Sequence, residues 1–87
     1  MSNSKIQALL ASLHDEVRGT KIDKETLSSL RALDSDIHDL LDEAKSEPTA
    51  DSVVEQARLL EARFAVEHPT AERFVREMID TLAKIGV

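Results

Sequence analysis

The sequence contains no cysteine, tryptophan or tyrosine, and only two glycines, two prolines and two phenylalanines. Without cysteine the chain has no disulfide, no thiolate metal ligand and no thiol nucleophile, and it fits a reducing compartment such as the cytoplasm. Few glycines and prolines leave few breaks in regular structure, and the abundant leucine, alanine, glutamate, arginine and lysine favour helix. The composition therefore predicts an all-α protein.

Long apolar runs are also missing. No stretch approaches the roughly 20 residues that a membrane-spanning helix needs. Residues 6–13 (IQALLASL) are mostly apolar, but they lead directly into His14, Asp15 and Glu16 without a small-residue cleavage site, so we interpret them as a helix face and not as a signal core. We expect no membrane partner and a cytoplasmic location. A chain of 87 residues suits one domain, so residues 1–87 are treated as a single helical domain.

The net charge of −6 comes from one region of the chain. Residues 34–51 contain seven acidic residues and only one basic residue, Lys45, whereas the acids and bases of the remaining sequence balance. Because binding to nucleic acid needs clustered Lys and Arg, we expect no nucleic-acid partner. A basic protein partner and a divalent cation remain open.

Apolar residues recur at helical spacing over four segments. The predicted helices span about residues 4–17, 24–45, 51–67 and 70–85. Gly19 is expected to end the first helix in the left-handed conformation, and Asp23 is expected to cap the second. Ser52 and Glu55 have the spacing of a capping box at the start of the third helix.

His68 and Pro69 interrupt the apolar pattern between the third and fourth helices. This break is compatible with a turn and with a kink in one continuous helix. We therefore predict a small antiparallel bundle of three to four helices with short loops. The residues expected to be mostly buried in its core are Leu30, Leu33, Ile37, Leu60, Phe64, Phe74, Met78 and Leu82.

The third predicted helix has two apolar stripes. Leu59, Ala62 and Val66 lie about 100° or more around the helix from the main stripe that contains Leu60 and Phe64. A bundle helix normally needs only one broad stripe, so the second one is a candidate interface. It is covered either by the first or fourth helix of the same chain or by a second subunit.

Asp34, His38 and Asp42 are spaced at i, i+4 and i+8 on the second predicted helix. Carboxylates and histidines at such spacing are weak candidates for a divalent-metal site. The simpler interpretation is a polar border on a packed face. His14 is interpreted as part of a solvated helix end. The sequence contains no phosphate-binding glycine motif and no glycine-rich turn that presents a serine nucleophile, so we expect no enzyme activity and no cofactor.

Three segments resemble a bacterial all-helical family known only as a domain of unknown function (DUF4404-like). They are EARFAVEHP at 61–69, DTLAKIGV at 80–87 and, more weakly, LRALDSDIHDLLDEA at 30–44. The resemblance covers nearly the full length and implies a helical fold and a bacterial source. It implies no activity and no site residues.

These features favour a non-enzymatic helical module for protein–protein interaction or self-association, expected as a homodimer. The alternative is a small regulatory or divalent-metal-binding protein that uses the acidic face of the second helix. The two stripes of the third helix support the first hypothesis, and the acidic region 34–51 supports the second.

Overall fold

A computed structural model of the chain describes residues 2–42 and 44–85, and the side chains of residues 4–42 and 44–84. Four helices make up the fold: α1 (Ser2–Arg18), α2 (Lys24–Leu40), α3 (Ala50–Glu67) and α4 (Pro69–Ile85). Within these described ranges there is no β-strand. The prediction of an all-α fold is therefore confirmed. The end of the last helix at Gly86 lies outside the described residues.

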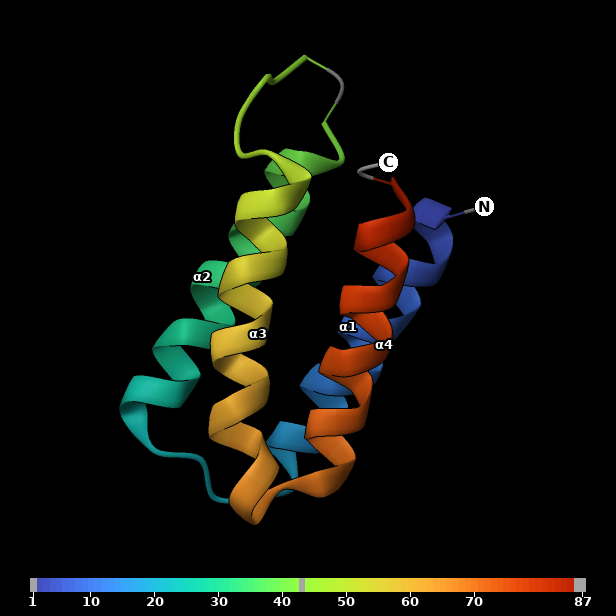
Figure 1. The fold of residues 1–87 in the computed structure, drawn as a ribbon. Coiled ribbons are helices and arrows are strands. Elements are labelled where there is room, and N and C mark those ends of the chain that lie inside the picture. The colour runs from blue at the N-terminus through green and yellow to red at the C-terminus, as the bar shows by residue number, and fades with distance from the viewer. Residues whose placement is uncertain (1, 43, 86–87) are drawn as a thin grey trace.

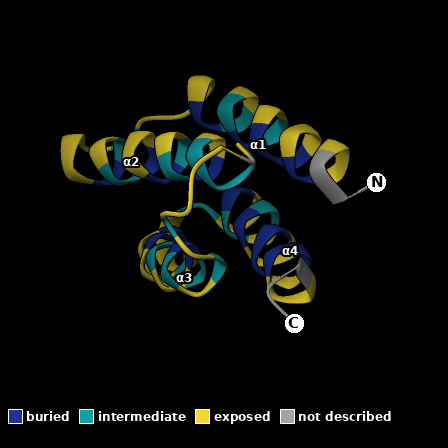
Figure 2. Cartoon of the chain, turned by 90° about the horizontal axis from the view of Figure 1, so that it is seen from above, coloured by how far each residue is buried: buried dark blue, intermediate teal, exposed yellow. Residues whose placement is uncertain are grey.

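The helices form two layers that enclose one core. Figure 1 shows an up-and-down arrangement in which each helix is antiparallel to the next, and Figure 2 shows α1 and α2 in one layer and α3 and α4 in the other. The closest packing joins α3 to α4, followed by α1 to α4 and α2 to α3. The backbones of α1 and α2 have no comparable contact, so the seam between these two helices is the open side of the bundle.

The core follows the predicted apolar stripes closely. Seven of the eight predicted core residues are buried, and Phe74 is the exception because it is only half-buried at the edge of the core. Ala71, Val75 and Met78 occupy the centre of the buried face of α4, which places Phe74 on its flank. The buried apolar residues are Ile6, Leu9, Leu10, Leu13, Val17, Leu30, Leu33, Ile37, Val53, Ala57, Leu60, Phe64, Ala71, Val75, Met78, Ile79 and Leu82.

Helix α2 is shorter than predicted. It ends at Leu40, not at residue 45, and residues 41–49 form a connection longer than the short loop expected. The Asp42 carboxylate accepts the backbone N–H of Ala44 at 3.0 Å, and the Lys45 ammonium donates to the Asp39 carboxylate at 2.9 Å. These local bonds compete with the helical ladder although the apolar pattern continues through Leu41.

The helix starts are defined by side-chain caps. Asp23 caps α2 by accepting from the Thr26 backbone and hydroxyl, and the hydroxyl bond is the main cause that lowers the pKa of Asp23. Thr49 caps α3 and accepts the backbone N–H of Ser52 at 3.2 Å. The predicted capping box starting at Ser52 is therefore wrong, because Ser52 already lies inside the helix.

The chain breaks predicted at Gly19 and at His68–Pro69 compare differently with the structure. Gly19 does not adopt the predicted left-handed conformation, since no described glycine has a positive φ. His68 ends α3 with φ −134° and ψ 69°, and Pro69 begins α4, so the chain reverses there. The sequence was compatible at this point with a turn or with a kink in one continuous helix, and the structure has a turn. The resulting α3–α4 hairpin places these two helices side by side (Figure 1), and the second stripe of α3 remains exposed.

Candidate functional site

The second stripe of α3 faces outward. Leu59 is 69% exposed and Val66 is 85% exposed, and they are the two exposed large apolar side chains in the described part of the chain. Ala62 lies between them and is also exposed. This arrangement rules out coverage by α1 or α4 of the same chain, which was one of the two alternatives for the stripe. We call Leu59, Ala62 and Val66 the outer face of α3.

Leu59 lies between two shallow hollows. One hollow, of about 120 Å³, lies between α2 and α3 and is lined by Ser29, Ala32, Gln56 and Leu59. The second, of about 370 Å³, is lined by Glu55, Arg58 and Leu59. The small side chains on α2 leave this space beside Leu59, so the outer face combines a protruding apolar group with an adjacent depression.

Polar contacts to α2 hold α3 in place along one flank of the outer face. The Gln56 amide donates to the Asp36 carboxylate and links α3 to α2. Arg63 forms an ion pair with Glu25 at 3.6 Å. Both contacts join α2 to α3, so the outer face is presented by a helix that is fixed against its neighbour.

Two carboxyl groups meet where α3 packs on α4. Glu61 faces Glu72, and the hydrogen bond between them, burial and the like charge of Glu72 raise the pKa of Glu61. Arg76 and Arg58 act in the opposite direction, and Arg76 forms an ion pair with Glu72 at 3.6 Å. This cluster sits beside the core and not on the outer face of α3.

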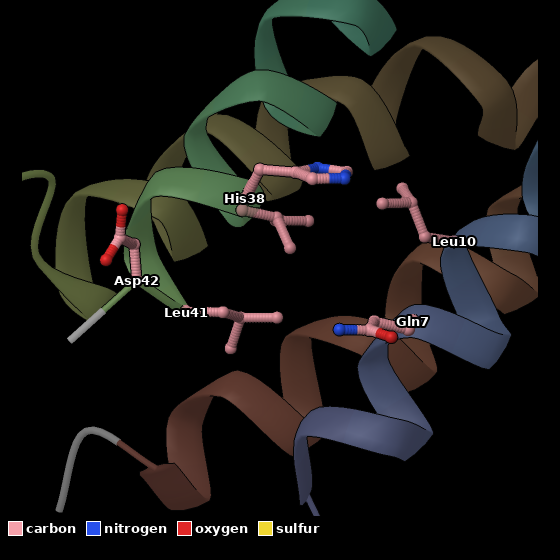
Figure 3. Close-up of a pocket in the computed structure, with 6 residues that line it drawn as sticks. Gln7, Leu10, His38, Leu41 and Asp42 are labelled. Atoms are coloured by element: carbon pink, nitrogen blue, oxygen red, sulfur yellow. The ribbon is translucent and has the colours of Figure 1, made fainter.

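A groove runs along the open seam between α1 and α2. Its two adjoining parts have volumes of about 220 Å³ and 400 Å³. Figure 3 shows Gln7 and Leu41 pointing toward each other across the seam, while the His38 ring extends toward Leu10 on α1. The residues that line the groove are Gln7, Leu10, Ala11 and His14 from the first helix, and Asp34, Ile37, His38, Leu41 and Asp42 from the second and the turn after it.

The groove contains the three weak metal candidates, but they do not converge. Asp34 and His38 come together, since the His38 Nδ1 lies 3.6 Å from the Asp34 carboxylate and 2.9 Å from the Asp34 carbonyl oxygen. Asp42 lies beyond the end of α2 at Leu40, and its carboxylate accepts the Ala44 N–H. Among the described side chains, no group of three or more His, Asp or Glu is placed to hold a metal ion.

The structure adds His14 to this cluster. Its Nε2 lies 3.6 Å from the Asp34 carboxylate, and both side chains are about one third exposed, so the interpretation as a solvated helix end is wrong. This contact joins α1 to α2 across the groove. The sequence carries no signal for it, because the contact depends on which residues of two antiparallel helices lie opposite each other.

Most described members of the acidic region 34–51 have local partners. Asp34 faces His14 and His38, Asp36 accepts from Gln56, and Asp39 pairs with Lys45. Asp51 lies in the first turn of α3, where the helix dipole favours a carboxylate. Glu43 lies outside the described residues. The acidic residues of this region therefore make several separate local contacts and do not form one continuous acidic surface.

Comparison with known proteins establishes the family. The up-and-down bundle with an outward apolar face on α3 belongs to the class of small all-α domains. The family model described as a domain of unknown function (DUF4404) matches residues 6–87, so the chain belongs to this family and the predicted resemblance is confirmed. No curated protein and no solved structure matches the chain. None of the described helices is long and apolar enough to cross a membrane.

Proposed function

We propose that this protein is a non-enzymatic helical module that self-associates as a homodimer through the outer face of α3. The observation that carries the proposal is the exposure of Leu59 and Val66 by 69% and 85%, while the other large apolar side chains of the described chain are buried or half-buried. A row of exposed apolar groups on a small domain is typical of an interaction surface.

The free energy of burying apolar side chains favours coverage of this face by a partner. Burial of a leucine or valine side chain contributes about 1.5–3 kcal/mol. A twofold dimer would bury Leu59 and Val66 of both copies, and this gain offsets part of the entropy that association costs. A domain of this size also has a limited core, so additional apolar burial supplements its stability.

The spacing of the outer face suits a helix–helix contact. Leu59, Ala62 and Val66 follow the i, i+3, i+7 pattern of an apolar seam, and the small Ala62 permits close approach of a second helix. The hollow beside Leu59, lined by Ser29 and Ala32, gives the same patch a depression next to its protrusion. A self-complementary patch of this kind closes a dimer about a twofold axis.

The setting proposed for this module is the cytoplasm of a bacterial cell. The absence of cysteine supports a reducing compartment, and the acidic balance supports a protein partner over nucleic acid. The groove supports a non-enzymatic role, since none of its described lining residues is a serine, threonine or lysine. No observation among the described residues favours the alternative of a metal-binding regulator.

Sedimentation equilibrium at micromolar concentration tests the proposal. The wild type is expected at the mass of a dimer. The double variant Leu59→Glu, Val66→Glu is expected to be a monomer with the circular dichroism of a folded helical protein, because both side chains are exposed in the monomer and tolerate charge. Ala83→Glu is the control, since Ala83 is exposed on α4 and its substitution should leave the dimer intact.

Either of two sedimentation results would overturn the proposal, and so would one circular dichroism result. One is a wild type that sediments as a monomer throughout the concentration range. The other is a double variant that keeps the dimer mass. If the double variant lost its helical signal, the outer face would belong to the folding core, which would also contradict the proposal.

A further inference from the structure

The groove between α1 and α2 is a second apolar surface, separate from the outer face of α3. Leu10 and Ile37 are 4% and 1% exposed and form its floor, and the half-buried Leu41 extends this floor toward Asp42. The groove exists because α1 and α2 each pack on the α3–α4 layer and not closely on each other. Its apolar floor is continuous with the protein core, and its mouth is open to solvent.

The described lining of the groove has two carboxylates and two histidines. Asp34 and Asp42 lie near its two ends, Asp34 with His14 and His38 each 3.6 Å away, and no lysine or arginine is among the described residues that line it. Arg31, one turn before Asp34 on α2, lines neither part of the groove. A ligand that fits both the floor and the rim therefore combines apolar groups with positive charge.

The dimensions of the groove suit a helix. The lining residues span positions 7–14 of α1 and positions 34–42 at the end of α2 and in the turn after it, and the helical parts of these spans are about 9–10 Å long. A helix lying in this seam would present about two turns, with apolar anchors at i, i+4 and i+7 toward the floor. Basic residues on either side of these anchors would reach Asp34 and Asp42.

The His38 ring is a further polar group on the rim. Its Nδ1 lies 2.9 Å from the Asp34 carbonyl oxygen, which leaves Nε2 as the ring nitrogen that is not bonded to Asp34. Figure 3 shows this ring directed across the groove toward α1. Asp34 and this ring line the same part of the groove, so a lysine or arginine side chain of a partner that reaches the Asp34 carboxylate would lie beside the His38 ring.

From this geometry we infer that the α1–α2 groove binds a basic amphipathic helix of a partner protein. The site is independent of the proposed dimer contact, since its lining shares no residue with the outer face of α3. The partner helix has leucine-like anchors on one face, with lysine or arginine on both flanks of that face.

The absence of tryptophan and tyrosine makes a direct binding assay possible. The probe is a synthetic helix of about 18 residues, long enough to form helix, with leucines at i and i+7, one tryptophan at the central anchor i+4 and lysines on both flanks. Because the protein has no tryptophan, a blue shift of the tryptophan emission reports burial of the probe alone. A second probe has glutamate in place of every lysine.

The expected result is saturable binding of the lysine probe at one helix per chain and no binding of the glutamate probe. Asp34→Asn combined with Asp42→Asn should weaken binding about tenfold at low salt, and less at high salt. The matched control combines Asp15→Asn with Asp80→Asn, which removes the same charge from exposed positions outside the groove. Ala11→Arg should abolish binding by filling and charging the groove, whereas Ala83→Arg on α4 should not.

Three outcomes would overturn the inference: no binding of the lysine probe, equal binding of the glutamate probe, or unchanged affinity in both the Asp34→Asn, Asp42→Asn protein and the Ala11→Arg protein. The Leu59→Glu, Val66→Glu protein separates this inference from the proposed dimer. It should bind the lysine probe with wild-type affinity, and loss of binding there would place the probe on the outer face of α3 and contradict the groove.

Discussion

The two apolar faces of α3 differ in what covers them. Val53, Ala57, Leu60 and Phe64 are at most 1% exposed because α2 and α4 pack against them. On the opposite side of the same helix, Leu59 and Val66 are open to solvent. Leu59 and Leu60 are neighbours with the same side chain, so the difference between them lies in their surroundings alone. The comparison shows that residue type does not decide a residue's role here, and that its angular position on the helix does.

The largest loss of stability is expected from substitutions on the face of α3 that α2 and α4 cover. Leu60→Ala and Phe64→Ala should each lower the free energy of unfolding by about 2–5 kcal/mol, because each removes buried groups and leaves a cavity. Leu59→Ala should change it by less than about 0.5 kcal/mol in the monomer, as surface substitutions do. Urea denaturation at the lowest workable chain concentration measures all three, so that dimer formation contributes little.

The neighbouring leucines provide the internal control of this measurement. They carry the same substitution in the same helix, so differences in helix propensity cancel. Similar losses for Leu59→Ala and Leu60→Ala would show that the two faces do not differ in coverage and that the register of α3 is wrong.

An intermediate loss of stability is expected from substitutions at the start of α3. Thr49→Ala removes the hydroxyl that accepts the Ser52 N–H and should cost about 1 kcal/mol, as loss of an N-cap does. Ser52→Ala should cost less, because Ser52 lies within the helix and alanine has the higher helix propensity there. Thermal or urea unfolding of both variants measures the difference. A larger loss for Ser52→Ala would favour the capping box predicted from the sequence.

The helices and most of the core could be predicted from the sequence, because apolar spacing at 3.6 residues per turn reports which side of each helix is buried. The end of α2 could not. Leu41 and Ala44 continue the apolar pattern, whereas the bonds from Asp42 and Lys45 that end the helix are local polar contacts. Periodicity contains no information about such competition.

The two candidate sites also differ in whether the sequence could predict them. The outer face of α3 was predictable, since an angular offset between two stripes on one helix can be calculated from spacing. The α1–α2 groove was not, because it depends on which helix pairs pack closely and which do not. His14 illustrates the limit: its contact with Asp34 joins residues that are distant in sequence and has no periodic signature.

The smallest effect is expected at Glu61, which lies at the edge of the covered face. Its pKa is raised, first by the hydrogen bond with Glu72 and then by burial and the charge of Glu72. A carboxyl group whose pKa is higher in the folded state adds stability below its unfolded pKa, which is near 4.5, and loses this contribution as the pH rises through the folded pKa. Ionisation of Glu61 therefore destabilises the fold beside Glu72.

Glu61→Gln removes this charge and keeps the size of the side chain. Its free energy of unfolding should exceed that of the wild type at pH 7, and the difference should shrink as the pH falls toward 4.5. Urea denaturation of both proteins at several pH values and one fixed chain concentration measures this trend. Glu77→Gln is the control, because Glu77 is exposed on α4. A Glu61→Gln protein that is less stable than the wild type at pH 7, or a difference that does not change with pH, would mean that the Glu61–Glu72 contact does not form where α3 meets α4.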